Sequence, residues 1–323
     1  MADSDLKYTV LSGGVGGAKL VLGLYEVLAP EQLSIVVNTG DDFEHLGLPI
    51  CPDTDTLMYT LAGTVNPATG WGLNDESWHF MEALEQLGGA AWFRLGDRDL
   101  ATHVRRRDLL NAGQTLSETT MTLLHESGVL SPVWPMSDMP VRTKIKSEGK
   151  LLDFQDYFVR LKAEPIATEI IYTGSEQATA SPDALAALQA KELGAIIITP
   201  SNPWLSIDPI LSLSDIKSSI TNSNAPVIGI SPIVDGQAIK GPTAKLMQEL
   251  GMNVSAYSIA EHYKDILDGL IIDQQDADQS EAIKKLGLQV GITNTVMKTL
   301  DDKKALAEFT LGFATKLYAD NSS

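Results

Sequence analysis

The pattern of apolar positions along the chain predicts strands that alternate with helices. Short apolar runs bounded by turn residues recur at residues 33–37, 169–172, 193–199, 225–230 and 267–272, and helical patterns separate several of them. This alternation is typical of βαβ units, in which parallel strands are buried on both faces. We therefore expect an α/β fold built around a mostly parallel sheet.

The first unit of this sheet is the clearest one. An apolar strand at residues 8–11 leads into a glycine-rich turn at residues 12–17. A helix is expected over residues 16–28, because leucines recur there every four residues and so lie on one helix face. The next strand begins at Leu33, which completes a βαβ unit.

A different pattern interrupts the strand rhythm after this unit. Apolar residues recur at helical spacing within residues 76–130, which predicts an inserted helical region. Residues 141–146 then alternate in strand fashion, a turn follows at residues 147–149, and residues 151–154 can return as a second strand, so a hairpin is expected. Near the end, residues 301–317 predict an amphipathic helix.

These patterns divide the chain into a core and an insert. With 323 residues and 44% hydrophobic content, the chain can bury a large core. We assign residues 1–75 and 165–323 to a nucleotide-binding core with the parallel sheet. Residues 76–164 form the insert, which combines the helices with the hairpin.

Composition excludes several classes of function. The chain has 42 acidic and 24 basic residues, a net charge of −18, which opposes binding to nucleic acid because phosphate backbones are bound mainly through Lys and Arg. Cys51 is the only cysteine and cannot form an intramolecular disulfide. The first residues lack the pattern of a signal peptide, and no apolar run approaches the roughly 20 residues of a membrane helix. We expect a cytoplasmic protein with no membrane and no nucleic-acid partner.

Four aspartates close together in the sequence are the strongest candidates for metal ligands. Asp41 and Asp42 follow the strand at residues 33–37, and Asp53 and Asp55 lie at the start of the next expected helix. Carboxylates that converge repel one another, and a cation relieves this repulsion. Mg²⁺ is the natural candidate beside a phosphate-binding loop, because it shares carboxylates with substrate phosphates. Asp53 could instead cap a helix and Asp42 could stabilise a turn, so we expect two of the four to bind Mg²⁺ and name Asp42 and Asp55 as these two ligands.

The glycine-rich turn predicts a phosphate site. Gly13, Gly14, Gly16 and Gly17 lie where a strand turns into a helix, and their missing side chains let phosphate oxygens approach backbone N–H groups. The spacing matches neither a Walker A loop nor the dinucleotide fingerprint. The alternative is that the glycines only form a tight turn that packs the helix against the strand. The glycine turn lies at the open edge of the sheet, which favours nucleotide binding.

Loops after two later strands are expected at the same edge. Ser201 and Asn202 follow one strand, and Ser231 and then Lys240 follow the next. Each could be an ordinary loop, but their recurrence at successive strand ends indicates a nucleotide site.

A basic patch in the insert is the remaining candidate. Asp97, Arg98 and His103 precede an arginine run at residues 105–107. A solvated helix face would explain the patch, whereas the guanidinium of Arg98 could clamp a phosphate, since its planar fork suits phosphate oxygens. The histidines show no metal-ligand spacing, and no serine or cysteine lies in a context typical of a nucleophile.

Six blocks of sequence, in this order, resemble the 2-phospho-L-lactate transferase family of coenzyme F-420 biosynthesis. They are Ser12-Gly13-Gly14-Val15-Gly16-Gly17-Ala18-Lys19, Val37-Asn38-Thr39-Gly40-Asp41-Asp42, Cys51-Pro52-Asp53-Thr54-Asp55-Thr56, Leu95-Gly96-Asp97-Arg98-Asp99-Leu100-Ala101-Thr102-His103, Pro200-Ser201-Asn202-Pro203 and Ser231-Pro232-Ile233. The likeness extends from about residue 8 to residue 317. Six separate blocks are far more specific than one glycine loop.

The resemblance implies a Rossmann-like domain with an added helical region and a Mg²⁺-dependent transfer. The donor would be a guanylylated phospho-acid, the acceptor the terminal ribityl hydroxyl of the deazaflavin Fo, and the leaving group GMP. The acid could be phospholactate, phosphoenolpyruvate or phosphoglycerate, which a few pocket contacts would distinguish. The main alternative is a non-catalytic nucleotide-sugar-binding regulator of related fold. The protein could also form a homodimer.

The resemblance also assigns roles to residues. The glycine loop and the loops at residues 200 and 231 would hold the guanosine diphosphate portion of the donor. The same loops would bind free GDP or GMP. The aspartates would hold the metal, and residues 96–103, with Asp97 and His103, would line the Fo side. Asp42, Asp55 and Arg98 are the expected catalytic residues; Asp42 or Asp55 could take the hydroxyl proton where it is not a metal ligand.

Overall fold

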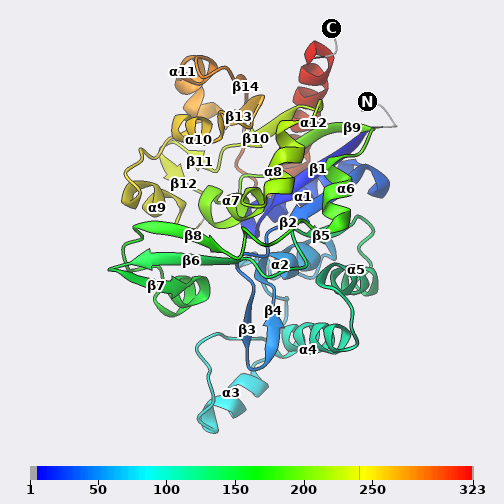
Figure 1. Ribbon diagram of the computed structural model, residues 1–323, viewed down its shortest axis with the longest axis vertical. Coiled ribbons are helices and arrows are strands. Elements are labelled where there is room, and N and C mark those ends of the chain that lie inside the picture. The colour runs from blue at the N-terminus through cyan, green and yellow to red at the C-terminus, as the bar shows by residue number, and fades with distance from the viewer. Residues whose placement is uncertain (1–5, 240, 322–323) are drawn as a thin grey trace.

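A parallel sheet forms the centre of the molecule. The computed structural model describes residues 6–239 and 241–321, and within them the sheet has seven strands (Figure 1). Their spatial order is β14 (Gln289–Thr293), β13 (Gly269–Asp273), β10 (Val227–Ile230), β9 (Leu193–Ile198), β1 (Lys7–Ser12), β2 (Leu33–Val37) and β5 (Val133–Pro135). Every neighbouring pair is parallel. The predicted α/β fold with a mostly parallel sheet is confirmed.

Helices cover both faces of this sheet. Successive strand residues point to opposite faces, so Val10 of β1 belongs to one hydrophobic core and Leu11 to the other. The first core is closed by α1 (Val15–Val27), α2 (Pro52–Leu61), α5 (Leu116–Glu126) and α12 (Leu300–Asn321). The second is closed by α6 (Pro182–Leu188), α7 (Asp208–Leu211), α8 (Ser214–Thr221), α9 (Thr243–Glu249), α10 (Ala256–Tyr263) and α11 (Ser280–Lys284). No helix in the described part of the chain is long and apolar enough to cross a membrane.

The strand order reverses between β1 and β9. From β1 the chain builds the sheet outward through β2 to β5, and it later returns to pair β9 on the other side of β1 before adding β10, β13 and β14. Leu11 is therefore paired with Val36 on one side and with Ile198 on the other. Ligands of open α/β sheets bind at the carboxyl ends of the strands beside such a reversal.

The insert extends from one end of the sheet. A hairpin of β3 (Phe43–His45) and β4 (Leu48–Ile50) runs toward α3 (His79–Gln86) and α4 (Asp97–Asn111), as Figure 1 shows. Ile50, Met81 and Leu95 are buried together there and form a small separate core. The helical region predicted within residues 76–130 is confirmed.

A second, antiparallel sheet corrects one strand prediction. The expected hairpin exists as β6 (Arg142–Ser147) and β7 (Lys150–Asp153), but β8 (Glu169–Thr173) pairs with β6 instead of joining the parallel sheet. β8 is only half-buried, unlike the fully buried strand β9, and a short apolar run does not reveal its partner. β5, from the predicted insert, pairs with β2, so strand pairing crosses the expected boundaries between core and insert. A further short hairpin joins β11 (Ile233–Val234) to β12 (Gln237–Ala238).

The long C-terminal helix packs against α1 at a glycine. A Cβ atom added to Gly23 would overlap the backbone carbonyl of Lys303 in α12. The two backbones can therefore approach closely only because residue 23 has no side chain. The helix predicted at residues 301–317 is confirmed as α12, which fixes α1 and hence the glycine turn before it.

We predict that Gly23→Ala lowers the free energy of unfolding by about 1–3 kcal/mol, because the helices must separate to accommodate the methyl group. Gly312→Ala is the matched control: it lies on α12, where an added Cβ has no atom within 4 Å. Its higher helix propensity should raise stability by up to about 1 kcal/mol. Urea denaturation measures both, and a stabilising effect of Gly23→Ala would contradict the close-packing argument.

Candidate active site

A large cavity lies at the carboxyl edge of the sheet. Its volume is about 660 Å³. The segments after five strands contribute to its walls: Gly14 after β1, Asp41 after β2, Ser201 after β9, Pro232 after β10 and Thr295 after β14. The cavity is therefore a product of the sheet topology, as expected at a strand-order reversal.

The glycine turn forms one wall of this cavity. Gly14 and Gly16 line it at the N-terminus of α1. The turn is also tightly packed: a Cβ at Gly14 would lie 2.6 Å from Asp53 Oδ1, and one at Gly16 would lie 2.9 Å from the carbonyl oxygen of Pro200. The packing role that we considered as an alternative is therefore present. It does not oppose ligand binding, since α1 has no side-chain N-cap among the described residues and its first N–H groups border the cavity.

Asp41 and Asp53 are two acidic residues that line the same cavity. Both are buried, and Asn38 Nδ2 donates to Asp53 Oδ2 at 2.9 Å. Burial raises the pKa of Asp41 well above its usual range, and the neighbouring charge of Asp53 raises it further. Burial also raises the pKa of Asp53, against the effect of the Asn38 hydrogen bond. Asp53 does not cap α2, whose N-cap residue is Cys51.

Asp42 lies on a smaller neighbouring cavity of about 350 Å³. Burial raises the pKa of Asp42 to about 7, although the charge of Arg142 and a hydrogen bond with Cys51 oppose this. Oδ1 of Asp41 and Oδ1 of Asp42 are both buried without a hydrogen-bond partner among the described residues. Such groups carry a desolvation cost that a ligand can relieve.

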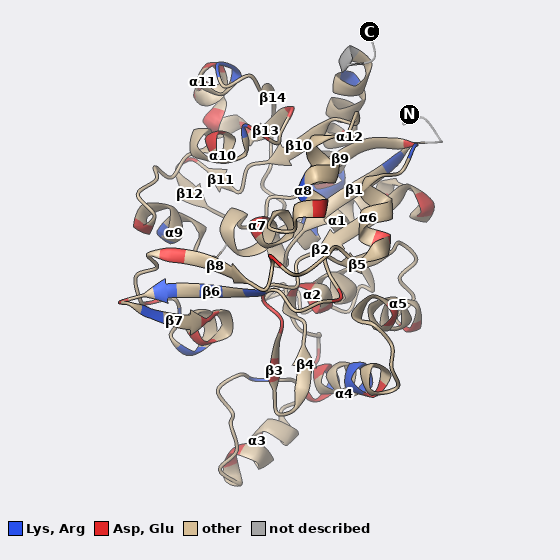
Figure 2. Ribbon diagram, viewed as in Figure 1, with Lys and Arg blue, Asp and Glu red and all other residues tan. Residues whose placement is uncertain are grey.

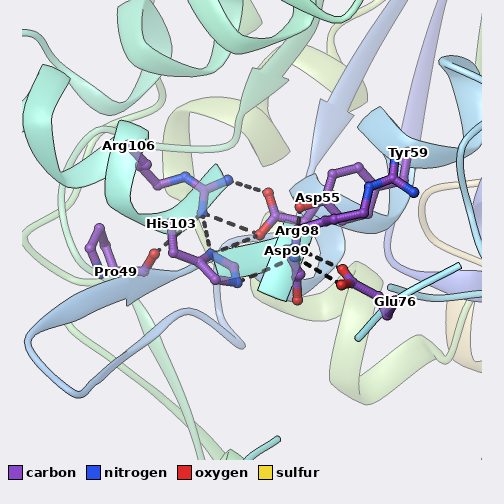
Figure 3. Close-up of polar contacts among 8 residues, drawn as sticks. All are labelled: Pro49, Asp55, Tyr59, Glu76, Arg98, Asp99, His103 and Arg106. Carbon is purple, nitrogen blue, oxygen red and sulfur yellow. Dashed lines mark hydrogen bonds and ion pairs between the residues drawn. The ribbon is translucent and has the colours of Figure 1, made fainter. Parts of the chain in front are cut away.

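Asp55 has a different environment from the other three aspartates. Both of its oxygens accept hydrogen bonds from the guanidinium of Arg106, one of them from Nη1 at 3.2 Å (Figure 3). Arg106 is completely buried in α4 and also donates to the carbonyl of Pro49. Burial disfavours the charged form of Arg106 and lowers its pKa. The charge and hydrogen bonds of the Asp55 carboxylate act in the other direction, and the pKa of Arg106 is raised on balance.

His103 and Asp99 extend this network to the cavity wall. Arg106 Nη1 lies 3.1 Å from His103 Nδ1, and arginine can only donate, so Nδ1 accepts and the ring proton is on Nε2. Nε2 faces Asp99 Oδ1 at 3.4 Å, and Asp99 also accepts from the Tyr59 hydroxyl at 2.6 Å. Burial raises the pKa of Asp99, but the contact with His103 Nε2 and the hydrogen bond from Tyr59 outweigh this effect, so the pKa of Asp99 is lowered. Asp55, His103, Asp99 and Tyr59 all line the larger cavity.

Sequence reasoning missed Arg106 because it lies within a charge run. Arg105 and Arg107 pair with acidic residues at or near the surface, as a solvated face predicts. Arg106 shares the inward face of α4 with His103 and Leu109, three residues away on each side. That spacing was the available signal.

The aspartates fit a Mg²⁺ ion only as a pair completed by substrate. Among the described residues no group of three or more acidic, histidine or cysteine side chains is arranged to hold a metal. Asp55, predicted as a ligand, has both oxygens bonded to Arg106. Asp42, the other predicted ligand, lines the smaller cavity and not the larger one. Asp41 and Asp53 remain on the larger cavity, and their mutual repulsion and the unpartnered Asp41 oxygen are what a cation would relieve. Two carboxylates suffice where phosphate oxygens and water complete the shell.

The other loop residues divide into those that line the cavity and those that do not. Ser201 and Asn202 line it; Asn202 also accepts from the backbone N–H groups of Trp204 and Leu205, and its Nδ2 donates to Thr243. Ser231 is fully buried and closes a turn through Ile233, while its neighbour Pro232 reaches the cavity. Lys240 lies outside the described residues.

Asp97 and Arg98 lie away from both cavities. Asp97 accepts hydrogen bonds from Ser77 Oγ and from the backbone N–H groups of His79 and Phe80, so it holds the start of α3. Arg98 donates to the carbonyl of Asn74 at 2.8 Å. Neither residue lines either cavity, and Arg98 has no ion pair with Asp97 or Asp99 in the part of the chain that is described. The structure thus places Asp97 and Arg98 outside both cavities, because the block folds as a helix start whose outward side carries them. Their roles at the ligand stay predictions.

An aromatic wall was not foreseen from the sequence. Part of the lining of the larger cavity is aromatic, and it comes from α2, the loop after α2, the segment before α4 and the segment after β7. Its aromatic side chains are Tyr59, Trp71, Trp92, Phe93, Phe154 and Phe158. Phe154 and Phe158 are stacked, with ring centroids 5.4 Å apart. These residues come from four separate regions, so no local motif shows that they converge.

Comparisons with known proteins agree with this architecture. A family model described as 2-phospho-L-lactate transferase CofD matches residues 8–307. A phosphoenolpyruvate transferase of Streptomyces griseus is 37% identical over 97% of this chain and 100% of its own length. A 2-phospho-L-lactate transferase of Methanocaldococcus jannaschii is 41% identical over 96% of this chain and 98% of its own length. The crystal structure of protein BH3568 from Bacillus halodurans has a TM-score of 0.63 at 15% identity, over 95% of this chain and 99% of that one, and shows likeness of fold alone.

We predict that Arg106→Gln lowers the free energy of unfolding by about 3–5 kcal/mol, because it leaves Asp55 buried without its counter-ion. Replacing both partners, as in Asp55→Leu with Arg106→Met, should recover much of this loss, since two apolar groups leave no buried charge. Arg105→Gln is the control, because Arg105 is exposed and its ion pairs should contribute little. Chemical denaturation measures all three, and equal effects of the two single arginine substitutions would contradict a special role for Arg106.

Proposed function

Since the chain belongs to the 2-phospho-L-lactate transferase family, we propose that it transfers a phospho-organic-acid group from a guanosine diphosphate-activated donor to the terminal hydroxyl of the deazaflavin Fo. GMP is the leaving group, and the product is a phosphodiester. The observation that carries the proposal is one cavity in which a phosphate-binding edge and an aromatic wall flank a pair of buried carboxylates.

The phosphate-binding edge suits the donor. The N-terminus of α1 offers backbone N–H groups and a favourable dipole to a diphosphate. Ser201, Asn202 and Thr243 supply polar groups beside it. Pro232 and Thr295, from the loops after β10 and β14, complete a surface for the guanosine portion.

The aromatic wall suits the acceptor. Fo is a planar tricycle with a flexible ribityl chain, and aromatic side chains bind planar rings through offset or edge-to-face contacts. Trp92 and Phe154 also line the smaller cavity beside Asp41, so a ring bound against them leaves its ribityl chain near the carboxylates. His103 and Asp99 can hydrogen-bond ribityl hydroxyls from the same wall.

Mg²⁺ held by Asp41 and Asp53 would supply charge neutralisation for the diphosphate and its leaving group. The chain itself must then exclude water and keep the attacking and leaving oxygens in line, because phosphoryl transfer depends mainly on positioning and electrostatics. Asn38 contributes by holding Asp53 in place through its 2.9 Å hydrogen bond.

The reaction balances without a covalent enzyme intermediate. The ribityl oxygen forms a bond to the phosphorus that carries the organic acid, and the bond from that phosphorus to the bridging oxygen breaks. GMP leaves with the electron pair, and the hydroxyl proton passes to a base. Asp42 is the better-placed of the two predicted bases, because the oxygens of Asp55 are bonded to Arg106.

The transferred acid is a small carboxylic acid esterified to phosphate. The relatives described above are named for 2-phospho-L-lactate and for phosphoenolpyruvate. We propose that this chain uses one of these two acids or phosphoglycerate, carried as its guanosine diphosphate ester.

The test is to incubate the protein with Fo, Mg²⁺ and each guanylylated acid. We expect a phosphorylated Fo derivative and GMP in equal amounts, followed by fluorescence-detected chromatography and mass spectrometry. Asp53→Asn should lower turnover on the order of 100-fold or more, with a weaker response to Mg²⁺. Asp301→Asn, on the exposed start of α12, is the control.

Two outcomes would contradict the proposal. A protein that binds GDP but transfers no acid from any of the three donors is a nucleotide-binding protein and not this enzyme. Unchanged turnover and Mg²⁺ response in Asp53→Asn would remove the carboxylate pair from the mechanism.

A further inference from the structure

The smaller cavity lies beside the reacting groups, and the mechanism above assigns no part of either substrate to its interior. It shares Asp41, Trp92, Phe154 and Gln155 with the larger cavity, so the two spaces adjoin at the carboxylates. Its remaining walls come from β3, from β6 and from the segment after β7. A group attached to a phosphorus at Asp41 would therefore have this space next to it.

The outer acidic residues of this cavity are already paired. Asp153 forms an ion pair with Lys144, Asp156 with Arg160 at 3.1 Å, and Glu44 with Arg107 at 3.1 Å. Figure 2 shows basic residues on β6 and β7 at this hairpin. Once these pairs are accounted for, Arg142 is the cation of the lining that has no carboxylate within 4 Å in residues 6–239 and 241–321.

Two hydrogen bonds to backbone carbonyls hold Arg142 in place, and its charge also acts on Asp42. Its Nη1 donates to the carbonyl of Thr39 at 3.2 Å and to the carbonyl of Val141 at 2.8 Å. The start of β6 is itself fixed, because the N–H of Thr143 donates to the carbonyl of Gly40 at 2.8 Å. The guanidinium is thus anchored beside the Asp41–Asp42 loop while most of its N–H groups remain for a ligand.

The proposal that follows rests on the proposed function. We propose that Arg142 binds the carboxylate of the transferred acid and that the smaller cavity is the acid subsite. In 2-phospholactate and in phosphoenolpyruvate the carboxylate is separated from the phosphate ester oxygen by a single carbon, so it must lie close to the phosphorus. A guanidinium fork binds a carboxylate through two parallel hydrogen bonds, which fixes both position and charge.

Charge explains why this contact matters. The donor brings a diphosphate and a carboxylate toward Asp41, Asp42 and Asp53 in a chain of net charge −18. The diphosphate has the N-terminus of α1 and, by the proposal above, Mg²⁺. The carboxylate needs a separate cation, since an unpaired buried carboxylate is costly. Arg142 is half-buried, where an ion pair is screened less than at the surface.

The competing explanation is that Arg142 only anchors the loop after β2. Substrates can separate the two roles, because an anchor affects every donor equally while a carboxylate receptor distinguishes a carboxylate from its neutral amide. The experiment therefore uses two guanylylated donors, one carrying lactate and one carrying lactamide. They have the same shape and differ in charge.

Wild-type protein should bind the lactyl donor about 10- to 100-fold more tightly than the lactamide donor, the range of one charged hydrogen-bonded contact. Arg142→Gln should reduce this preference to about threefold or less by weakening the lactyl donor alone, with GDP affinity and the KM for Fo unchanged. Arg142→Lys should retain part of the preference, because it keeps charge but not the fork. Calorimetric titration gives the affinities and steady-state kinetics the KM values.

Arg160→Gln is the matched control, since it removes a basic residue near the cavity that does not line it. It should keep the full preference for lactate. An unchanged preference in Arg142→Gln, or an equal loss of both donors and of GDP, would overturn the carboxylate assignment and leave Arg142 as a loop anchor. If wild-type protein transferred neither acid, the proposed function itself would fail, which is a separate result.

Discussion

The buried ion pair between Asp55 and Arg106 is the constraint on which the candidate site depends. A guanidinium and a carboxylate are both desolvated here, and this is tolerable because they pair with each other and because Pro49 and His103 accept further hydrogen bonds from Arg106. Asp55 belongs to a helix of the core and Arg106 to a helix of the insert. The wall that carries His103, Asp99 and Tyr59 therefore forms only when the insert is docked on the core. Displacing α4 would separate Asp55 from Arg106 and leave two buried charges without partners.

The sheet imposes the complementary constraint on the phosphate side. Because the strand order reverses between β1 and β9, loops distant in sequence meet at one edge, and close packing at Gly14 and Gly16 leaves little freedom in how they meet. Asp53 is positioned by this packing and by Asn38. The site thus has two parts. One consists of the closely packed loops at the edge of the sheet, and the other of side chains that α2 and α4 bring into contact. The carboxylate pair Asp41 and Asp53 stands where the two halves meet.

Much of this was predictable from the sequence, and the exceptions have physical reasons. Buried parallel strands, the glycine turn and the aspartates after β2 leave local signals, since each depends on residues adjacent in the chain. β8 was assigned to the wrong sheet because a half-buried strand does not reveal its partner. Arg98 was preferred to Arg106 on the strength of a motif, whereas helical spacing with His103 and Leu109 was the better guide to which arginine faces inward. The aromatic wall and the place of Arg142 depend on contacts between distant segments, which no local pattern records.

The pairing of β1 with β9 also has a consequence for how the chain is made. Thr199, just after β9, hydrogen-bonds to Leu11 of β1 across 188 positions of sequence. During synthesis β1 can pair with β2 early, but its other edge has no partner until β9 has emerged from the ribosome. An unpaired edge of a hydrophobic strand is a template for association with other chains, and contacts at such sequence separation form slowly. The same strand reversal that creates the ligand site therefore leaves one edge of β1 open in the nascent protein until residues 193–198 have been synthesised.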